Sequence, residues 1–370
     1  MVIILGIEST AHTFGIGIVK DGKILSNARD MYTTETGGII PIESAKHHNA
    51  CAEKVWNDAL TKANVSEKDI CSIAISQAPG LAPCLIAGMK FAKKKALELG
   101  VPIVPVNHCV AHLEIGRLTG AIDPVLLYAS GANTQIIAYA AGKYRVFGET
   151  LDIGIGNFID TFARHTGLGF PGGPKIMELA LDGKYIEIPY SIKGMDVAFS
   201  GLLTNLKQKY DKGEKIEDLA YSLQETAFAM LVEASERALA HTGKKELLLG
   251  GGVGCNTRLQ EMCRIMCEER GCKFFVPENQ YLVDNAAMIA YLGEIIYNSI
   301  NNSNNKINVN NKKKADNIIN VNKKNIKIGE GGEGKKNNTE QGKLIYYSQD
   351  FDKLDINPRE RTDDVIVKWR

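Results

Sequence analysis

Hydrophobic and polar positions alternate along the chain in a pattern that occurs twice. Each repeat reads as three short strands joined by tight turns, then a helix, a strand, a helix and a strand. The first repeat has expected strands at Val2–Ile7, Gly15–Lys20, Lys23–Ala28, Ile70–Ser76 and Ile103–Pro105, and helices at Ile42–Ala63 and Pro83–Leu99. The second has strands at Pro124–Ala129, Thr134–Ala140, Tyr144–Glu149, Glu246–Leu249 and Phe274–Val276, and helices at Gly156–His165, Pro174–Asp182, Glu217–His241 and Cys255–Arg270. This repetition predicts a duplicated α/β fold with two lobes facing a cleft.

The same pattern sets the expected domain limits. We predict an N-terminal lobe over residues 1–122 and a C-terminal lobe, with the nucleotide and metal residues, over residues 123–300. Between residues 301 and 343 there are 13 Asn and 10 Lys against 4 acidic residues, and there is no aromatic residue. Such a composition cannot bury enough apolar surface to offset the entropy of ordering. We therefore expect a disordered insert at 301–343 and a C-terminal tail at 344–370.

Composition excludes several protein classes. The chain is 44% hydrophobic and 24% charged, with a net charge of +1, which is typical of a globular protein. Apolar runs such as Met1–Ile7 are far shorter than the ~20 residues that a membrane span requires. Eight cysteines scattered over 370 residues do not form a disulfide framework. We expect a cytoplasmic protein with no membrane partner.

Three glycine-bearing turns lie where the predicted cleft would be. They are Gly6–Thr10, Ser130–Thr134 and Gly250–Asn256, the last running from a strand into a helix. A glycine turn before a helix presents free N–H groups and a positive dipole end, both of which favour phosphate. Each turn alone is also compatible with simple packing. Equivalent turns in both halves favour a nucleotide-type ligand.

A pair of histidines suggests a metal site. His108 and His112 are four residues apart, so a helix would present both imidazoles on one face. Asp284, at the expected start of a late helix, is a candidate third ligand, although helix capping would equally explain it. A packed helix face is the alternative for the histidines. No glutamate follows His108 as in zinc proteases, so the general base of that class is absent.

Six segments together resemble the motifs of one family. These are Gly6–Thr13, Val106–His112, Val146–Asp152, Gly194–Gly201, Gly251–Asn256 and Arg361–Asp363. The family is the archaeal and eukaryotic tRNA threonylcarbamoyladenosine transferase, the catalytic subunit of the KEOPS complex. The resemblance implies an actin/Hsp70/sugar-kinase-like (ribonuclease-H-like) fold. It also implies transfer of threonylcarbamoyl from threonylcarbamoyl-AMP to N6 of adenosine 37 in tRNAs that read codons beginning with A.

The resemblance also implies ligands and partners. The metal ligands would be His108, His112 and Asp284, with Tyr128 at the metal, and the ion would be iron(II) ahead of zinc(II). The adenylate would lie against Tyr128, Ala129, Ser130, Gly131, Ala132, Asp160, Gly173, Met177 and Asn256. No base for the attacking amine is identifiable, and Glu8 and His12 are the hypotheses. The implied partners are tRNA and KEOPS subunits, including a small kinase-like ATPase, a dimerising subunit and a third regulatory one.

Several positions depart from the family pattern. Alanine replaces glycine at Ala78, Ala82, Ala132 and Ala286, Ile86 stands at an arginine position, and Met177 stands at a glutamate position. A methyl group at a glycine with positive φ costs ~1 kcal/mol or more, which puts donor affinity in question.

Two rival functions stay open beside the transferase. One is an ATP-dependent small-molecule kinase of the same fold, and the other is a non-catalytic assembly subunit. A metallopeptidase is a third, disfavoured by the missing glutamate.

Overall fold

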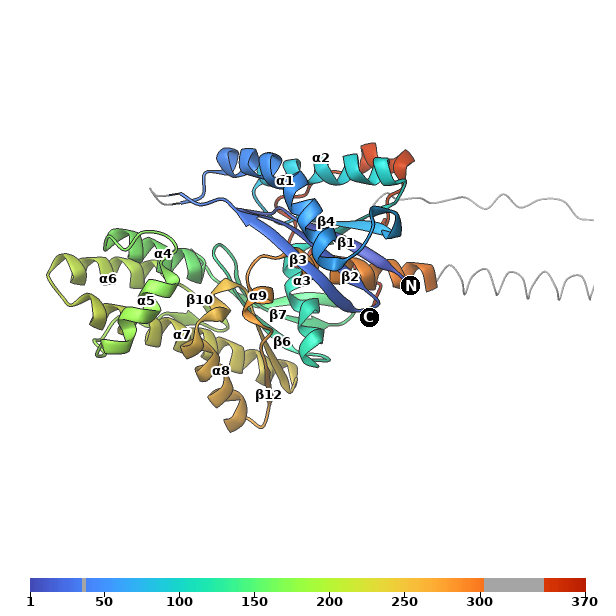
Figure 1. Ribbon diagram of the computed structural model, residues 1–370. Helices are drawn as coiled ribbons and strands as arrows, with labels where there is room; N and C mark the ends of the chain where they lie inside the picture. The colour runs from blue at the N-terminus through green and yellow to red at the C-terminus, as the bar shows by residue number, and fades with distance from the viewer. Residues whose placement is uncertain (35–37, 303–342) are drawn as a thin grey trace, which may run out of the picture.

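The structure, a computed structural model, describes residues 1–34, 38–302 and 343–370. Apart from its ends, the predicted Asn- and Lys-rich insert lies outside the described residues. The described chain forms two five-stranded sheets with helices packed against them (Figure 1). Within this part, no helix combines the length and the hydropathy that a membrane crossing needs.

The N-terminal sheet has the strand order β3-β2-β1-β4-β5. Its strands are β1 (Ile3–Glu8), β2 (Thr13–Lys20), β3 (Lys23–Met31), β4 (Ser72–Ala78) and β5 (Ile103–Asn107). The first three form an antiparallel meander, and β4 and β5 add in parallel. Helices α1 (Pro41–Ala63) and α2 (Ala82–Leu99) cover one face, where Trp56 is fully buried.

The C-terminal sheet repeats this arrangement with the order β12-β11-β6-β7-β8. Its strands are β6 (Val125–Ala129), β7 (Thr134–Ala140), β8 (Lys143–Glu149), β11 (Glu246–Gly250) and β12 (Lys273–Phe275). Its helices are α4 (Ile155–His165), α5 (Gly173–Leu179), α6 (Ser200–Asp211), α7 (Ile216–Thr242) and α8 (Thr257–Glu269). Since β6 pairs antiparallel with β7 and parallel with β11, as β1 does with β2 and β4, the predicted duplication is confirmed.

Some elements were not predicted. The short hairpin of β9 (Ile192–Lys193) and β10 (Asp196–Val197) and helix α6 lie in the long stretch between α5 and α7. Helix α9 (Asn279–Leu282) was not predicted either, whereas the late helix expected after Asp284 is present over residues 286–302 and packs against the N-terminal sheet. Its approach requires glycine: a Cβ at Gly6 would lie 2.3 Å from the backbone nitrogen of Ala290, and one at Gly17 would lie 2.4 Å from that of Ala287.

A third core lies between the two sheets. It combines side chains of both sheets with α3 (His108–Glu114) and the helix over residues 286–302, as in the contact set Ile4, Val106, Val110, Leu126 and Met288. The C-terminal tail also packs against both lobes. Tyr346 pairs with Ile103 at the edge of β5, and Leu354 joins the outer core of the N-terminal lobe. Elements from both lobes therefore hold α3 in place.

His48 on α1 makes the stability of this lobe depend on pH. Its ring is fully buried, and Nε2 lies 3.0 Å from the carbonyl oxygen of Ala11. Burial lowers the pKa of His48 from 6.5 to about 4, against the opposing effect of that carbonyl. Because the unfolded chain takes up this proton at a higher pH than the folded one, stability present above pH 6.5 is lost as the pH falls toward 4. The expected loss is about 3 kcal/mol.

The variant His48→Gln tests this, since glutamine can still donate to the Ala11 carbonyl. Its free energy of unfolding, measured by chemical denaturation between pH 4 and 7, is expected to change less with pH than that of the wild type. An unchanged slope would show that another group causes the acid sensitivity.

Candidate metal and nucleotide site

Helix α3 carries both predicted histidines. The chain leaves β5 at Asn107, whose side-chain Oδ1 accepts a hydrogen bond from the backbone N–H of Val110 at 3.2 Å and so caps the helix. The spacing of four residues then places the His108 and His112 rings 4.8 Å apart, edge to face. The two imidazoles therefore share one face of α3, as predicted.

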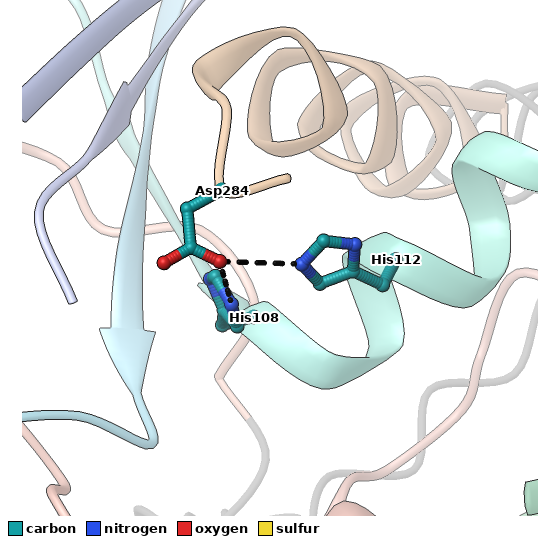
Figure 2. A group of neighbouring side chains, drawn as sticks. All are labelled: His108, His112 and Asp284. Atoms are coloured by element: carbon teal, nitrogen blue, oxygen red, sulfur yellow. Dashed lines mark ion pairs between the residues drawn. The ribbon is translucent and has the colours of Figure 1, made fainter. Parts of the chain in front are cut away.

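Asp284 completes the cluster from the other side (Figure 2). Its Oδ1 lies 3.2 Å from Nε2 of His108 and 3.6 Å from Nε2 of His112. One donor atom from each of the three residues lies within 4.8 Å of the others. His108 and His112 are buried, whereas the Asp284 side chain is 23% exposed. Three side chains distant in sequence thus converge on one point.

Glu8 lies behind His108. Its Oε2 is 2.9 Å from Nδ1 of His108, and its Oε1 accepts from the backbone N–H of Thr10 at 2.7 Å. The carboxylate is fully buried at the end of β1. A carboxylate on the far nitrogen of an imidazole fixes the ring's orientation and directs the other nitrogen forward. Glu8 is thus turned toward the histidine, and no solvent reaches it.

The electrostatics of the three residues are coupled. Burial acts to lower the pKa of His108, but Glu8 and Asp284 outweigh it and raise that pKa well above its ordinary value. Burial raises the pKa of Asp284, yet the two histidines lower it well below its ordinary value. Burial lowers the pKa of His112. In the absence of a cation, Asp284 is therefore an ionised carboxylate paired with a protonated His108, whereas His112 is the neutral imidazole.

The donor set fits a divalent cation. Neither ring nitrogen of His112 has a hydrogen-bond partner, although both are buried. Buried polar atoms without a partner are rare in folded proteins, and a ligand commonly explains them. Two imidazoles and a carboxylate suit iron(II), zinc(II) or manganese(II). The cluster could therefore hold one such ion.

Tyr128, at the end of β6, lies beside the cluster. Its ring centroid is 4.9 Å from that of His112, and its side chain is 1% exposed. Burial raises the pKa of its hydroxyl well above the ordinary value, with a hydrogen bond to Ser130 opposing. Tyr128 thus links the histidines to the predicted nucleotide turn at Ser130.

A cleft of about 280 Å³ opens beside that turn. Among the predicted adenylate residues, Gly131, Asp160, Gly173, Met177 and Asn256 line it, as does His12. Tyr128, Ala129, Ser130 and Ala132 do not line it, although they form the adjoining strand end and turn. None of the three cluster residues lines the cleft, but its residue Gly252 lies near the cluster: a Cβ there would be 3.8 Å from the side chain of Val283, which precedes Asp284 in the chain.

The glycine turns contribute to the cleft differently from what was expected. In the second turn, Ser130 Oγ donates to the carbonyl of Asn133 at 2.9 Å, so its side chain serves the turn. In the third, Asn256 caps α8 by accepting from the backbone N–H groups of Arg258 and Leu259, and its amide donates to Gln224 at 2.7 Å. The expected free N–H groups at this helix start are therefore partly occupied.

Additional cleft residues were not predicted. Phe170 and Pro171, in the loop before α5, line the wall, together with Gly156 and Ile159 of α4. Gly251 next to the wall has a φ of 87°, and a Cβ there would lie 2.4 Å from the Ala129 carbonyl oxygen. In the sequence, a run of glycines before a helix is the recognisable sign of such a loop, and Pro171 begins a similar run, Pro-Gly-Gly-Pro, whereas nothing local marks Phe170.

The alanines at family glycine positions cause no backbone strain. In the described residues, positive φ angles outside glycine occur at Asp21, Asn64 and Ala141. Ala78, Ala82, Ala132 and Ala286 are not among them, so their methyl groups carry no conformational penalty of that kind. Ala286 contacts the N-terminal sheet, where a Cβ added at Gly15 would lie 3.2 Å from it. Ile86 on α2 is 41% exposed.

Comparison with known proteins gives the family. The family model described as tRNA N6-adenosine threonylcarbamoyltransferase matches residues 23–291. A curated protein of that name from Thermococcus kodakarensis is 58% identical over 297 residues, covering 80% of this chain and 91% of its own length. A Methanosarcina mazei protein named a probable bifunctional tRNA threonylcarbamoyladenosine biosynthesis protein is 54% identical over 303 residues. That match covers 80% of this chain and 55% of the relative.

Solved structures agree on the fold. Full-length HypF in its phosphate- and nucleotide-bound form matches with a TM-score of 0.55 at 12% identity, over 78% of this chain and 45% of that chain. The Clostridium difficile activator of 2-hydroxyisocaproyl-CoA dehydratase, with bound ADPNP, matches with a TM-score of 0.50 at 11% identity, over 78% and 94%. At such low identity these structural matches bear on the fold alone, and they confirm the predicted actin-like fold class. By its sequence, the chain belongs to the tRNA N6-adenosine threonylcarbamoyltransferases, transferases that modify tRNA.

Proposed function

We propose that this chain transfers the threonylcarbamoyl group of threonylcarbamoyl-AMP to N6 of adenosine 37 in tRNAs that read codons beginning with A. One observation carries the proposal: a His-His-Asp cluster with two buried histidines lies near a cleft lined by glycines. His108, His112 and Asp284 would hold one divalent cation, iron(II) ahead of zinc(II). When bound, the cation would supply Lewis-acid polarisation of the acyl group.

The cleft would bind the adenylate. Gly131 and Gly173 leave room for the backbone to approach the phosphate or ribose. Asp160 Oδ1 accepts from the backbone N–H of Gly172 at 2.8 Å, so its second oxygen would be available to a ribose hydroxyl. Met177 would lie against the base, since a thioether packs well on aromatic rings. Ala129, Ser130 and Ala132 would shape the turn, and Asn256 would hold the α8 end of the wall.

The chain's own residues would mainly position the reactants. AMP is a good leaving group, so holding the acyl carbon near the tRNA amine accounts for much of the catalysis. Of the two hypothetical bases, His12 lines the cleft and its Nδ1 has no hydrogen-bond partner. Glu8 is buried against His108 and would orient that ring. His12 is therefore the candidate that would take the proton of the attacking amine.

The proposal includes partners and a compartment. tRNA is the substrate of this family, as its name states. We expect the chain to work in the cytoplasm with KEOPS subunits, including a small kinase-like ATPase, a dimerising subunit and a regulatory one. Membership of the family supports the partners, and so does the bifunctional name of a relative of which this chain spans about half.

A reconstituted assay tests the function. Chain, threonylcarbamoyl-AMP and unmodified tRNA are incubated with and without partner subunits, and the nucleosides are read by mass. Modified adenosine is expected, falling to background after metal chelation and returning when the metal is restored. A kinase would instead phosphorylate a small acceptor with ATP, independently of His108. No product under any of these conditions would favour the non-catalytic subunit.

A further inference from the structure

The segment Arg361–Asp363, one of the six family-like motifs, has no part in the site described above. It lies within residues 357–370, which cross from one lobe to the other. Near one end, the backbone N–H of Asn357 donates to the Gln77 carbonyl at 3.1 Å. Further along, Arg361 pairs with Glu149 of β8 at 3.2 Å. We call residues 357–370 the brace.

The brace forms a hydrogen bond at the start of α3. Glu360 Oε2 accepts from Asn107 Nδ2 at 2.9 Å, while Oδ1 of the same amide caps the helix. Glu360 therefore fixes the orientation of the Asn107 amide, with Nδ2 toward Glu360 and Oδ1 toward the helix. In this orientation Oδ1 can cap α3 directly before His108. Two residues further along the brace, the buried Thr362 donates from its hydroxyl to Oε1 of Gln135 on β7 at 3.3 Å.

The brace also forms hydrogen bonds at the end of α3. Glu114 is fully buried, and its Oε1 accepts from Trp369 Nε1 at 3.3 Å and from Arg370 Nε at 3.2 Å. The Tyr144 hydroxyl and the Arg117 guanidinium are further partners of this carboxylate. Arg370 also stacks over the Tyr144 ring, with its guanidinium carbon 5.5 Å from the centroid.

Two features of α3 make these polar contacts important: it is short, and a pocket separates part of it from the brace. A helix of seven residues has too few internal hydrogen bonds to set its own position. On the side of the brace, a cavity of about 530 Å³ lies between Asn107 and Val110 and the brace residues Glu360, Asp364 and Trp369. Although all seven residues of α3 are buried, this space between α3 and the brace is not filled by side chains, and the hydrogen bonds at the two ends of α3 join it to the brace across the pocket.

We propose that Glu360 and Arg370 are positioning residues, through which the brace holds α3 in the geometry that lets His108 and His112 bind a cation together with Asp284. This rests on the metal site proposed above. Partners that orient metal ligands without touching the metal typically contribute roughly 10- to 100-fold to affinity. Loss of the Glu360 contact is expected to weaken cation binding, although Glu360 does not belong to the cluster.

Cobalt(II) alone is titrated into the full-length chain after metal removal, and its dissociation constant is measured by absorbance and calorimetry. Glu360→Ala is expected to bind about tenfold more weakly than the wild type. Glu360→Gln, whose carbonyl can still accept from Asn107, is expected to stay within about twofold. Arg370→Ala is expected to weaken binding as well, because Glu114 loses a partner at the other end of α3.

A stability control separates positioning from general loosening. Leu206 is fully buried in the outer core of the C-terminal lobe, away from α3, so Leu206→Ala lowers the melting temperature without touching the brace. Equal cobalt affinity in Glu360→Ala and the wild type would overturn the proposal. Equally weak binding in Leu206→Ala would do the same, as would failure of Glu360→Gln to rescue. A wild type that binds no cobalt(II) would refute the metal site itself and the brace's role with it.

Discussion

Replacing His112 with alanine is expected to remove the bound cation and to lower the transferase rate by on the order of a thousandfold. The ring nitrogen nearest Asp284 is a ligand in the proposed site, and no other described imidazole besides His108 lies in this cluster. Two remaining ligands would bind a divalent ion weakly. Metal content by elemental analysis and product formation by nucleoside mass are the two measurements.

The fold should tolerate this change. Because neither His112 nitrogen has a hydrogen-bond partner, removal of the ring leaves no polar group newly unpaired. The matched control is His165→Ala on α4, whose ring pairs with Asp211 at 2.8 Å outside the cluster. It should keep the metal and the rate of the wild type. If His112→Ala also kept both, the three residues would not form the catalytic metal site.

The duplicated fold could be predicted because its repeat lies in local patterning. Each half carries three apolar strands followed by amphipathic helices, and the two sheets have the same order. Helix α6 was missed for the opposite reason: Leu202 and Leu206 are its only buried residues, too few to produce a helical periodicity. The hairpin of β9 and β10 has two residues in each strand, below what alternation can indicate.

The candidate site could be predicted only where its residues form a local sequence pattern. The spacing of His108 and His112 within one helix is a local signal, so the pair could be found from the sequence. Glu8 is 100 residues away from His108, and Glu360 is 253 residues away from Asn107. No local pattern records such contacts, because they arise from tertiary packing. For this reason Glu8 was only a candidate base, whereas the structure turns it toward a histidine.

Filling the cleft should have the second large effect. Gly173 begins α5 and lines the cleft, and a Cβ there would meet no atom within 4 Å. Its φ is not positive, so leucine meets no left-handed backbone strain there. In Gly173→Leu the side chain would extend into space proposed for the adenylate. Affinity for AMP, measured by calorimetry, is expected to fall by about a hundredfold, or roughly 3 kcal/mol.

Gly201 provides the matched control for this substitution. It lies in the first turn of α6, its Cβ position is equally open, its φ is also not positive, and it does not line the cleft. Leucine at Gly201 should hold or raise the melting temperature, because glycine in a helix is less favourable than other residues by up to ~1 kcal/mol. At Gly173 the following Pro174 offsets this gain, so the melting temperature of Gly173→Leu is measured to show that the variant is folded. If Gly173→Leu bound AMP as tightly as Gly201→Leu, the adenylate would have to lie elsewhere. A selective loss in Gly173→Leu, with both variants folded, would assign the nucleotide to the space beside the His-His-Asp cluster.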